Sequence, residues 1–172
     1  VECDPLAFSD AHLLNTSGAK VLSGANTVAE LVRPGKIVIA ISESNIDLCR
    51  RIEEQISAEH DNGAMTCDVE CAAVPERYPA GSEKQLIKIV ADREVPVNRL
   101  PIHVGVLVLN VATVTAVAES VDDGIPLIER YLTVTPIADA DSNSPQYAPT
   151  VVRARVGTPI RHVLESLNVL TG

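Results

Sequence analysis

The sequence of 172 residues contains no tryptophan, one phenylalanine and three tyrosines. A hydrophobic core must therefore be built from aliphatic side chains, and the hydrophobic fraction of 46% is high enough to exclude global disorder. No apolar run reaches the roughly 18 residues that a membrane-spanning helix requires. The N-terminus also lacks the basic and then apolar pattern of a signal peptide. We therefore expect no direct insertion into a membrane.

Positive charge is scarce as well. The chain has 14 Lys and Arg against 23 Asp and Glu, a net charge of -9, and no basic run offsets this deficit, so nucleic acid is not an expected partner. Cys67 and Cys71 lack the second ligand pair that a zinc site needs, and the four histidines are scattered. Hydrolase and P-loop motifs are absent. We therefore expect no metal site and assign no catalytic residue.

The clearest structural pattern lies near the middle of the chain. Residues 36–42 form a continuous run of mostly β-branched side chains, typical of a central strand covered on both faces. Apolar residues then recur at helical spacing from Ile46 to Ile56, which predicts an amphipathic helix to about His60. Residues 65–74 return as a strand. This β-α-β unit, with its parallel crossover, predicts the α/β class.

Similar elements lie on both sides of this unit. Residues 7–32 read as two short helices, and a further helix opens at residues 81–83. The apolar segment 104–109 predicts a third buried strand, followed by a helix that starts at Asn110. These elements extend the α/β pattern over the first 124 residues.

The pattern changes after Gly124. Residues 127–135 and 150–156 are strand-like, and a polar linker over 138–149 joins them. A short helix over 160–167 follows, with Thr158 predicted as its N-cap. Two strands and a helix predict a small β-grasp-like appendage rather than a continuation of the first sheet. We therefore predict one domain over residues 1–124 and a second over residues 125–172.

Three segments fall where an open α/β sheet binds ligands, beyond the carboxyl ends of strands and at helix N-termini. They are Glu2-Cys3-Asp4-Pro5, the turn of residues 78–85, and Asn110-Val111-Ala112-Thr113. Each has a structural explanation when it is taken singly. The acids could belong to a solvated terminus, Ser82-Glu83 could be an ordinary first-turn pair, and Asn110 could be a helix cap.

Taken together, these segments resemble a known family. Glu-Cys-Asp-Pro, Tyr-Pro-Ala-Gly-Ser-Glu-Lys-Gln-Leu-Ile, the segment of residues 100–113 and Pro-Leu-Ile-Glu-Arg resemble the RnfC-like proteins of Rnf electron-transport complexes, in the same order and at similar spacing. That family is related to the flavin-binding subunit of respiratory complex I. Residues 152–160 resemble the soluble-ligand-binding β-grasp (SLBB) module that follows the flavin domain in this family.

The resemblance implies a Rossmann-like parallel-sheet domain that binds FMN, oxidises NADH and passes electrons to iron–sulfur clusters outside this segment. It also implies a ferredoxin-type electron acceptor and partner subunits that hold the protein at the cytoplasmic face of the inner membrane. The residues that match cofactor-binding positions are Glu2, Asp4, Tyr78, Gly81, Glu83, Asn110 and Thr113.

Some positions depart from the family pattern. Leu109 and Ala112 stand where the family often has an amide and a glycine, which would weaken the polar contacts to the flavin. The family's Gly-rich loop comes before Glu2 and its cluster cysteines come after the β-grasp module, so we expect this chain to be an excised core. Two alternatives stay open at this point. One is a non-catalytic docking or small-ligand module, and the other is a relative linked to cobalamin reductase or proline reductase.

Overall fold

The computed structural model describes residues 1, 2, 4, 6–135 and 148–169, and it is a mixed α/β structure. Most of the polar linker predicted over 138–149 lies outside the described residues, as do Cys3 and Pro5 of the N-terminal motif. The elements are α1 (Ser9–Val32), β1 (Lys36–Ser42), the 3-10 turn η1 (Glu43–Asn45), α2 (Ile46–Asp61), β2 (Asp68–Val74), α3 (Glu83–Ala91), the 3-10 turn η2 (Pro101–Val104), α4 (Val111–Asp122), β3 (Glu129–Val134), β4 (Thr150–Arg155) and α5 (Ile160–Ser166).

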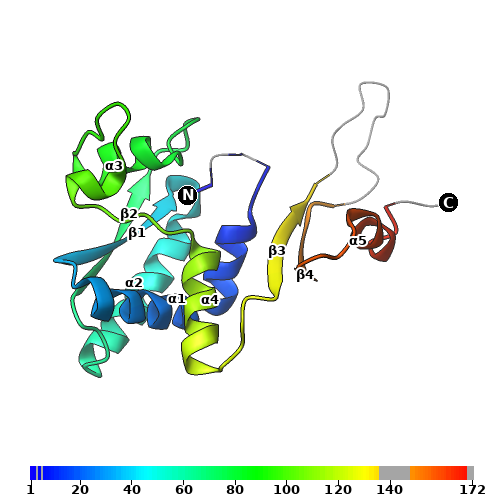
Figure 1. The fold of residues 1–172 in the computed structure, drawn as a ribbon, viewed down its shortest axis with the longest axis horizontal. Coiled ribbons are helices and arrows are strands. Elements are labelled where there is room, and N and C mark those ends of the chain that lie inside the picture. The colour runs from blue at the N-terminus through cyan, green and yellow to red at the C-terminus, as the bar shows by residue number, and fades with distance from the viewer. Residues whose placement is uncertain (3, 5, 136–147, 170–172) are drawn as a thin grey trace.

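The predicted β-α-β unit is confirmed. Strands β1 and β2 pair in parallel, from Lys36 opposite Asp68 to Ser42 opposite Val74, and α2 forms the crossover between them. The buried side chains of α2 recur at the predicted helical spacing and pack against Ile39 and Ile41 of β1. We call the part from α1 to α4 (Ser9–Asp122) the α/β body. Its helices α1 and α2 pack against the small sheet, and α4 packs against α1 (Figure 1).

The two helices predicted over 7–32 are confirmed as the two sides of a kink. Ser17 has non-helical dihedral angles (φ -137°, ψ 31°) in the middle of α1. Beyond this kink, α1 packs closely against α4. A Cβ atom at Gly24 would overlap the backbone carbonyl of Val114, so only glycine permits this approach of the two helices.

The predicted strand over 104–109 is wrong. Pro101–Val104 forms η2, and Gly105 ends it with a left-handed φ of 69°. The backbone N–H groups of Gly105 and Val106 donate to Ile102 and Pro101 within this turn, so they are not available for a ladder. Residues 106–110 carry no strand assignment, although the helix predicted to start at Asn110 is confirmed as α4. The apolar composition of the segment was a misleading signal because Pro101 and Gly105 favour a turn.

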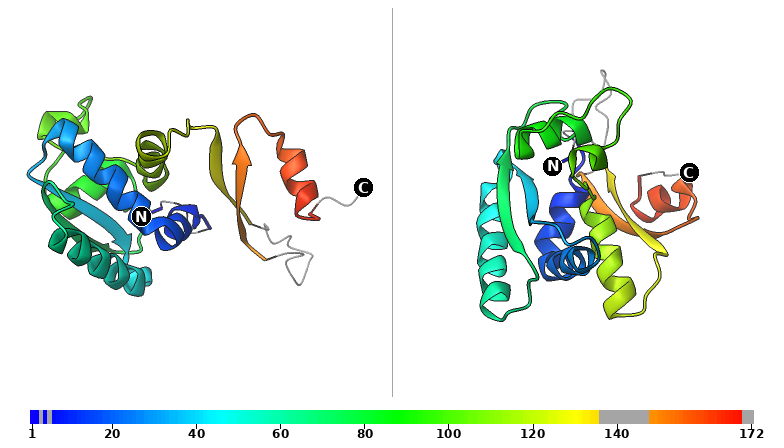
Figure 2. Two further views of the ribbon diagram at one scale, coloured as in Figure 1. Left: turned by 90° about the horizontal axis from the view of Figure 1, so that it is seen from below. Right: turned by 60° about the vertical axis from the view of Figure 1, so that its left-hand side comes forward.

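The part from β3 to α5 (Glu129–Ser166), here the C-terminal unit, is an antiparallel hairpin followed by a helix. Glu129 lies opposite Arg155, and Val134 lies opposite Thr150. Figure 2 shows this hairpin and α5 projecting from one side of the α/β body.

The predicted cap of α5 is wrong by one position. The helix starts at Ile160 with Pro159 at the N-cap, because the first helical N–H groups, those of His162 and Val163, donate to the Pro159 carbonyl. No helix among the described residues is long and apolar enough to cross a bilayer.

Candidate functional site

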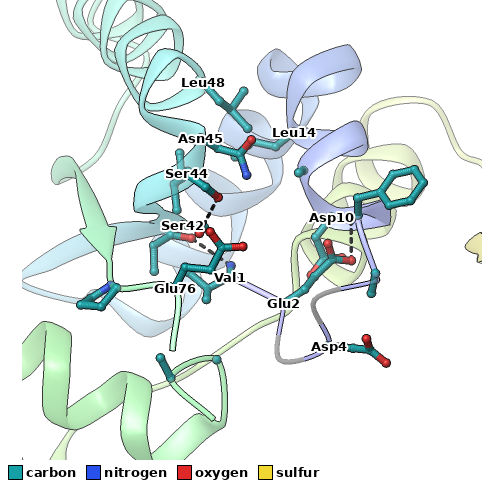
Figure 3. A pocket seen from close by; sticks show the side chains of 18 of the residues that line it. Val1, Glu2, Asp4, Asp10, Leu14, Ser42, Ser44, Asn45, Leu48 and Glu76 are labelled. Atoms are coloured by element: carbon teal, nitrogen blue, oxygen red, sulfur yellow. Dashed lines mark hydrogen bonds between the residues drawn. The ribbon is translucent and has the colours of Figure 1, made fainter. Parts of the chain in front are cut away.

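A cavity of about 240 Å³ opens at the carboxyl end of β1. Ligands collect at this edge of an α/β sheet because helix N-termini and loops meet there. Three parts of the chain form its wall: the N-terminal segment with the start of α1, the end of β1 with η1 and α2, and the loop between β2 and α3 (Figure 3). Val111 of α4 completes the wall. The polar lining residues are Glu2, Asp4, Asp10, Ser42, Ser44, Asn45, Glu76, Arg77 and Tyr78.

Glu2 lies in the cavity wall and also caps α1. Its Oε1 accepts hydrogen bonds from the Ser9 hydroxyl at 3.0 Å and from the Asp10 backbone N–H at 3.1 Å. Phe8, at the N-cap position, provides no side-chain cap of its own, so Glu2 satisfies a backbone donor that the helix start leaves free. The second carboxylate oxygen, Oε2, makes no hydrogen bond within the described residues. Glu2 can therefore hold the helix and still present an acceptor to a ligand.

Asp4 and the turn of residues 75–81 border the opening. Asp4 is exposed, and its Oδ1 accepts from the Leu6 backbone N–H at 2.9 Å in a local turn. Its Oδ2 makes no hydrogen bond with any residue that the structure describes. Tyr78 lines the cavity with 80% of its surface exposed, so its ring is available for stacking. Gly81 lines the same wall and has no side chain that would keep a planar group away from the backbone.

Three of the predicted site residues do not line the cavity. Glu83 is the exposed first residue of α3, and Thr113 is exposed in the first turn of α4. Asn110 caps α4, because its Oδ1 accepts from the Ala112 backbone N–H at 2.8 Å. Its Nδ2 donates to Asp10, which does line the cavity, at 2.7 Å. The structure thus places Glu2, Asp4, Tyr78 and Gly81 at one cavity and connects Asn110 to it through Asp10.

The motifs did not single out several polar residues of the cavity. Asp10 follows the N-terminal motif by a few residues, and in sequence it reads only as an acid in the first turn of a helix. Ser42, Ser44 and Asn45 lie across the cavity from Glu2 and Asp10 (Figure 3). They follow the first predicted strand directly, so their position after a parallel strand is the signal that could have identified them.

The charge of the cavity limits what it can bind. Among its side chains, four are carboxylates and Arg77 is the one cation within the described residues. Carboxylates and hydroxyls suit the hydroxyl groups of a ribose or ribityl chain, whereas a phosphate prefers cations and free backbone N–H groups. The described residues therefore fit the sugar and ring parts of a flavin or nicotinamide nucleotide, and they supply few groups for its phosphate.

The cysteines that the structure describes lie away from this cavity, and the acidic residues described there are not grouped as metal ligands. Nowhere in the described part of the chain do three His, Cys, Asp or Glu side chains cluster in a way that could hold a metal ion. Cys49 and Cys71 pack together between α2 and β2, away from the cavity lining. Burial and the neighbouring Cys49 raise the pKa of the Cys71 thiol to about 12, which keeps it protonated and unreactive.

Comparison with known proteins agrees with the motif-based prediction. Residues 1–119 match the family described as the Nuo51 FMN-binding domain. The chain is 32% identical over 165 residues, 96% of its length, to the C subunit of an ion-translocating oxidoreductase complex of Edwardsiella ictaluri. It is 34% identical over 164 residues, 95% of its length, to the C subunit of a Na(+)-translocating ferredoxin:NAD(+) oxidoreductase complex of Acetobacterium woodii. The chain spans only 19% of the first relative and 34% of the second.

Proposed function

This chain belongs to the Nuo51 FMN-binding domain family, and we propose that it forms the flavin- and NADH-binding part of an RnfC-like electron-transport subunit. The observation that carries this proposal is the cavity at the end of β1. It brings together the acids of the N-terminal motif and the turn that contains Tyr78 and Gly81, two segments that lie more than 70 positions apart in the sequence.

The residues of this chain would bind and orient the cofactor. Glu2 and Asp4 each have an acceptor oxygen available for sugar hydroxyls, and the Tyr78 ring is free to stack on a planar ring. Gly81 allows such a ring to approach the backbone closely. Bound FMN would supply the chemistry, which is hydride acceptance from NADH and transfer of single electrons to iron–sulfur clusters.

Asn110, Thr113 and Glu83 would act at the edge of this site. Asn110 caps α4 beside the cavity, and Thr113 offers a hydroxyl in the first turn of the same helix, where the helix dipole favours a phosphate. Glu83 at the start of α3 is exposed and could contact a nucleotide that lies over the 75–81 turn.

The domain and partner assignments form part of the same proposal. Residues 1–124 would be a Rossmann-like flavin domain, and residues 125–172 would be an SLBB-type β-grasp module that contains the described hairpin and helix. The name of the Acetobacterium woodii relative supports NAD(H) and a ferredoxin-type protein as the two redox partners. The names of both relatives support the other subunits of an ion-translocating complex as partners. Those subunits would hold the protein at the cytoplasmic face of the inner membrane.

The direct test is flavin binding by the full-length gene product, followed by anaerobic addition of NADH. Bound FMN whose absorbance bleaches with NADH would support the oxidoreductase. Asn110→Ala should lower FMN occupancy, and Glu83→Gln should slow flavin reduction without loss of the flavin. Glu54→Gln, which changes an exposed carboxylate of α2 outside the cavity, is the matched control and should leave both properties unchanged.

A second candidate is a docking module that has lost the flavin. The segment between α3 and α4 supports it, because Val97, Leu100 and Ile102 are 85%, 64% and 70% exposed. Exposed apolar side chains in such a concentration are typical of a surface that meets a partner. A full-length protein that folds but binds neither FMN nor NADH would favour this candidate over the enzyme.

A further inference from the structure

We infer that Asp10, which belongs to none of the recognised motifs, is the positioning residue that joins the N-terminal acidic motif to Asn110 and so assembles the flavin site. This inference rests on the proposed function, because Asn110 matters to a ligand only if the cavity holds one. Asp10 does not need to contact the cofactor in this role. It affects cofactor binding because it sets where the start of α4 lies relative to the cavity.

A continuous series of hydrogen bonds carries the inference. Glu2 Oε1 accepts from the Asp10 backbone N–H at 3.1 Å, and Asp10 Oδ2 accepts from Asn110 Nδ2 at 2.7 Å. Asn110 Oδ1 then accepts from the Ala112 backbone N–H at 2.8 Å. The series connects the first residues of the chain to the first turn of α4 across a sequence separation of 100 residues. Asp10 takes part in the first two of these three links, one through its backbone and one through its side chain.

Donor and acceptor chemistry fixes the direction of each link. An ionised carboxylate can only accept, so the Asn110 side chain must turn its NH2 group to Asp10. Its oxygen then points to the Ala112 N–H, which is the orientation that an N-cap requires. The Ala112 N–H selects the same orientation, because it can only donate. The Asp10 carboxylate adds to this selection and ties the amide to the start of α1, so it positions a residue that the family resemblance places at the flavin.

An ordinary first-turn acid is the alternative role for Asp10. Such an acid stabilises the positive end of α1 through the helix dipole and needs no partner on α4. The two roles differ in what a reciprocal exchange would do. The double variant Asp10→Asn with Asn110→Asp removes the acid from α1. It nevertheless keeps a hydrogen-bonded pair, in which the new amide on α1 donates to the new carboxylate on α4 and that carboxylate caps α4. If FMN affinity returns in this variant, Asp10 acts by positioning the α4 cap. If it does not return, Asp10 acts by stabilising the positive end of α1.

The experiment measures FMN affinity in the full-length protein for Asp10→Asn, Asn110→Asp and the double variant. We expect the FMN Kd to rise about tenfold in Asn110→Asp, because two carboxylates would then face each other with no hydrogen bond between them. In Asp10→Asn it should rise about fivefold, because the bond to Asn110 remains only as a weaker neutral one. The double variant should return to within about twofold of the original value. Asp122→Asn is the matched control. It makes the same chemical change in the same pair of helices, at the end of α4 far from the cavity, where Asp122 accepts from the Ser23 hydroxyl at 2.7 Å. Its FMN affinity should not change.

A second measurement does not depend on the flavin. Hydrogen exchange at the Ala112 amide should become faster in Asp10→Asn, slow again in the double variant, and stay unchanged in Asp122→Asn. Unchanged exchange and unchanged FMN affinity in Asp10→Asn would overturn the inference, and so would a double variant that restores neither property. If the wild-type protein binds no FMN, the proposed function fails, and the Ala112 measurement still decides whether Asp10 positions the cap.

Discussion

The α/β body and the C-terminal unit are stabilised in different ways. The body has a cluster of ten buried residues from α1, β1, α2 and α4, among them Leu22 and Ile52, which are 2% and 1% exposed. In the described part of the C-terminal unit, Val163 is the one buried residue, and neither strand of the hairpin has any. Burial of apolar surface therefore accounts for the stability of the body and contributes far less to the unit.

The C-terminal unit relies instead on polar contacts, some within the hairpin and some to the rest of the chain. Arg153 of β4 lies 3.5 Å from Glu119 of α4 and 2.6 Å from Glu129 of β3, and its guanidinium lies 5.7 Å from the centre of the Tyr131 ring. The Phe8 backbone N–H donates to the Thr133 hydroxyl at 3.2 Å. Such half-exposed contacts contribute little individually and are weakened by salt. The comparison predicts a stable body and a unit that opens locally at lower cost.

The largest expected effect comes from truncation in the core of the body. Ile52→Ala should lower the free energy of unfolding by about 2–5 kcal/mol, because the side chain is fully enclosed and the shell around it cannot collapse completely. Val163→Ala in the C-terminal unit should cost only about 1–2 kcal/mol, because Val163 is less completely enclosed (8% exposed, against 1% for Ile52) and its truncation removes one carbon atom fewer. Urea unfolding followed by circular dichroism measures both values.

Ile52→Val is the graded control and should cost about 0.5–1.5 kcal/mol. An equal loss in Ile52→Ala and Val163→Ala would contradict the comparison, because it would mean that the C-terminal unit has a core as well packed as that of the body.

The second effect concerns the contact between α1 and α4. Gly24→Ala should lower the free energy of unfolding by about 1–3 kcal/mol, because the new methyl group would overlap the Val114 carbonyl and force the helices apart. Gly35→Ala is the control, since a Cβ there meets no atom within 4 Å. Thermal unfolding of the two variants gives the difference directly. An unchanged free energy of unfolding in Gly24→Ala would show that α1 and α4 can move apart at no cost. The close packing of the body would then contribute less to its stability than we propose.

The contrast between the two regions also shows how far the sequence alone predicts this molecule. Periodicity identified α2, because its apolar residues repeat every three or four positions and its burial follows them. It failed over residues 104–109, because an apolar run has the same composition whether or not a partner strand is present. Here Pro101 begins a 3-10 turn and Gly105 ends it, so no strand forms. The motifs singled out Glu2, which lines the cavity, and Asn110, which does not line it but is hydrogen-bonded to the lining residue Asp10. They did not single out Asp10 itself, because its contact with Asn110 joins residues 100 positions apart.

The third effect is a loss of stability at high pH that should affect the body. Burial raises the pKa of Cys71 in β2 to about 12, whereas an unfolded thiol loses its proton near pH 9. Between these values the unfolded chain binds fewer protons than the folded chain, so the free energy of unfolding falls as the pH rises from 9 to 12. Because the thiol is about half exposed, solvent screening reduces the expected loss to about 1–2 kcal/mol.

The measurement is urea unfolding at about pH 8 and about pH 10.5, on either side of the unfolded thiol's pKa, for the wild-type protein and for Cys71→Ala. The difference between the two proteins should shrink at the higher pH, because Cys71→Ala lacks the buried thiol. A difference that does not change with pH would show that Cys71 is well solvated in the folded state.

The smallest effect tests the attachment of the C-terminal unit. Arg153→Gln should lower the free energy of local opening of β3 and β4 by about 0.5–1 kcal/mol, because it removes the ion pairs to Glu119 and Glu129 and the contact with the Tyr131 ring. Hydrogen exchange should therefore become faster at hairpin amides and stay unchanged in α2. Arg155→Gln is the matched control: Arg155 lies on the same strand, but its side chain is 78% exposed and 3.8 Å from Glu129, so little should change.

Salt gives an independent check of the same contacts. Raising the ionic strength to about 0.5 M should reproduce part of the Arg153→Gln effect in the wild-type hairpin and add little in the variant, because the screened charges are already gone. If Arg153→Gln instead accelerated exchange throughout α1 and α4, the polar contacts would be supporting the body itself. The distinction between a region held by burial and a region held by charge would then not apply to this protein.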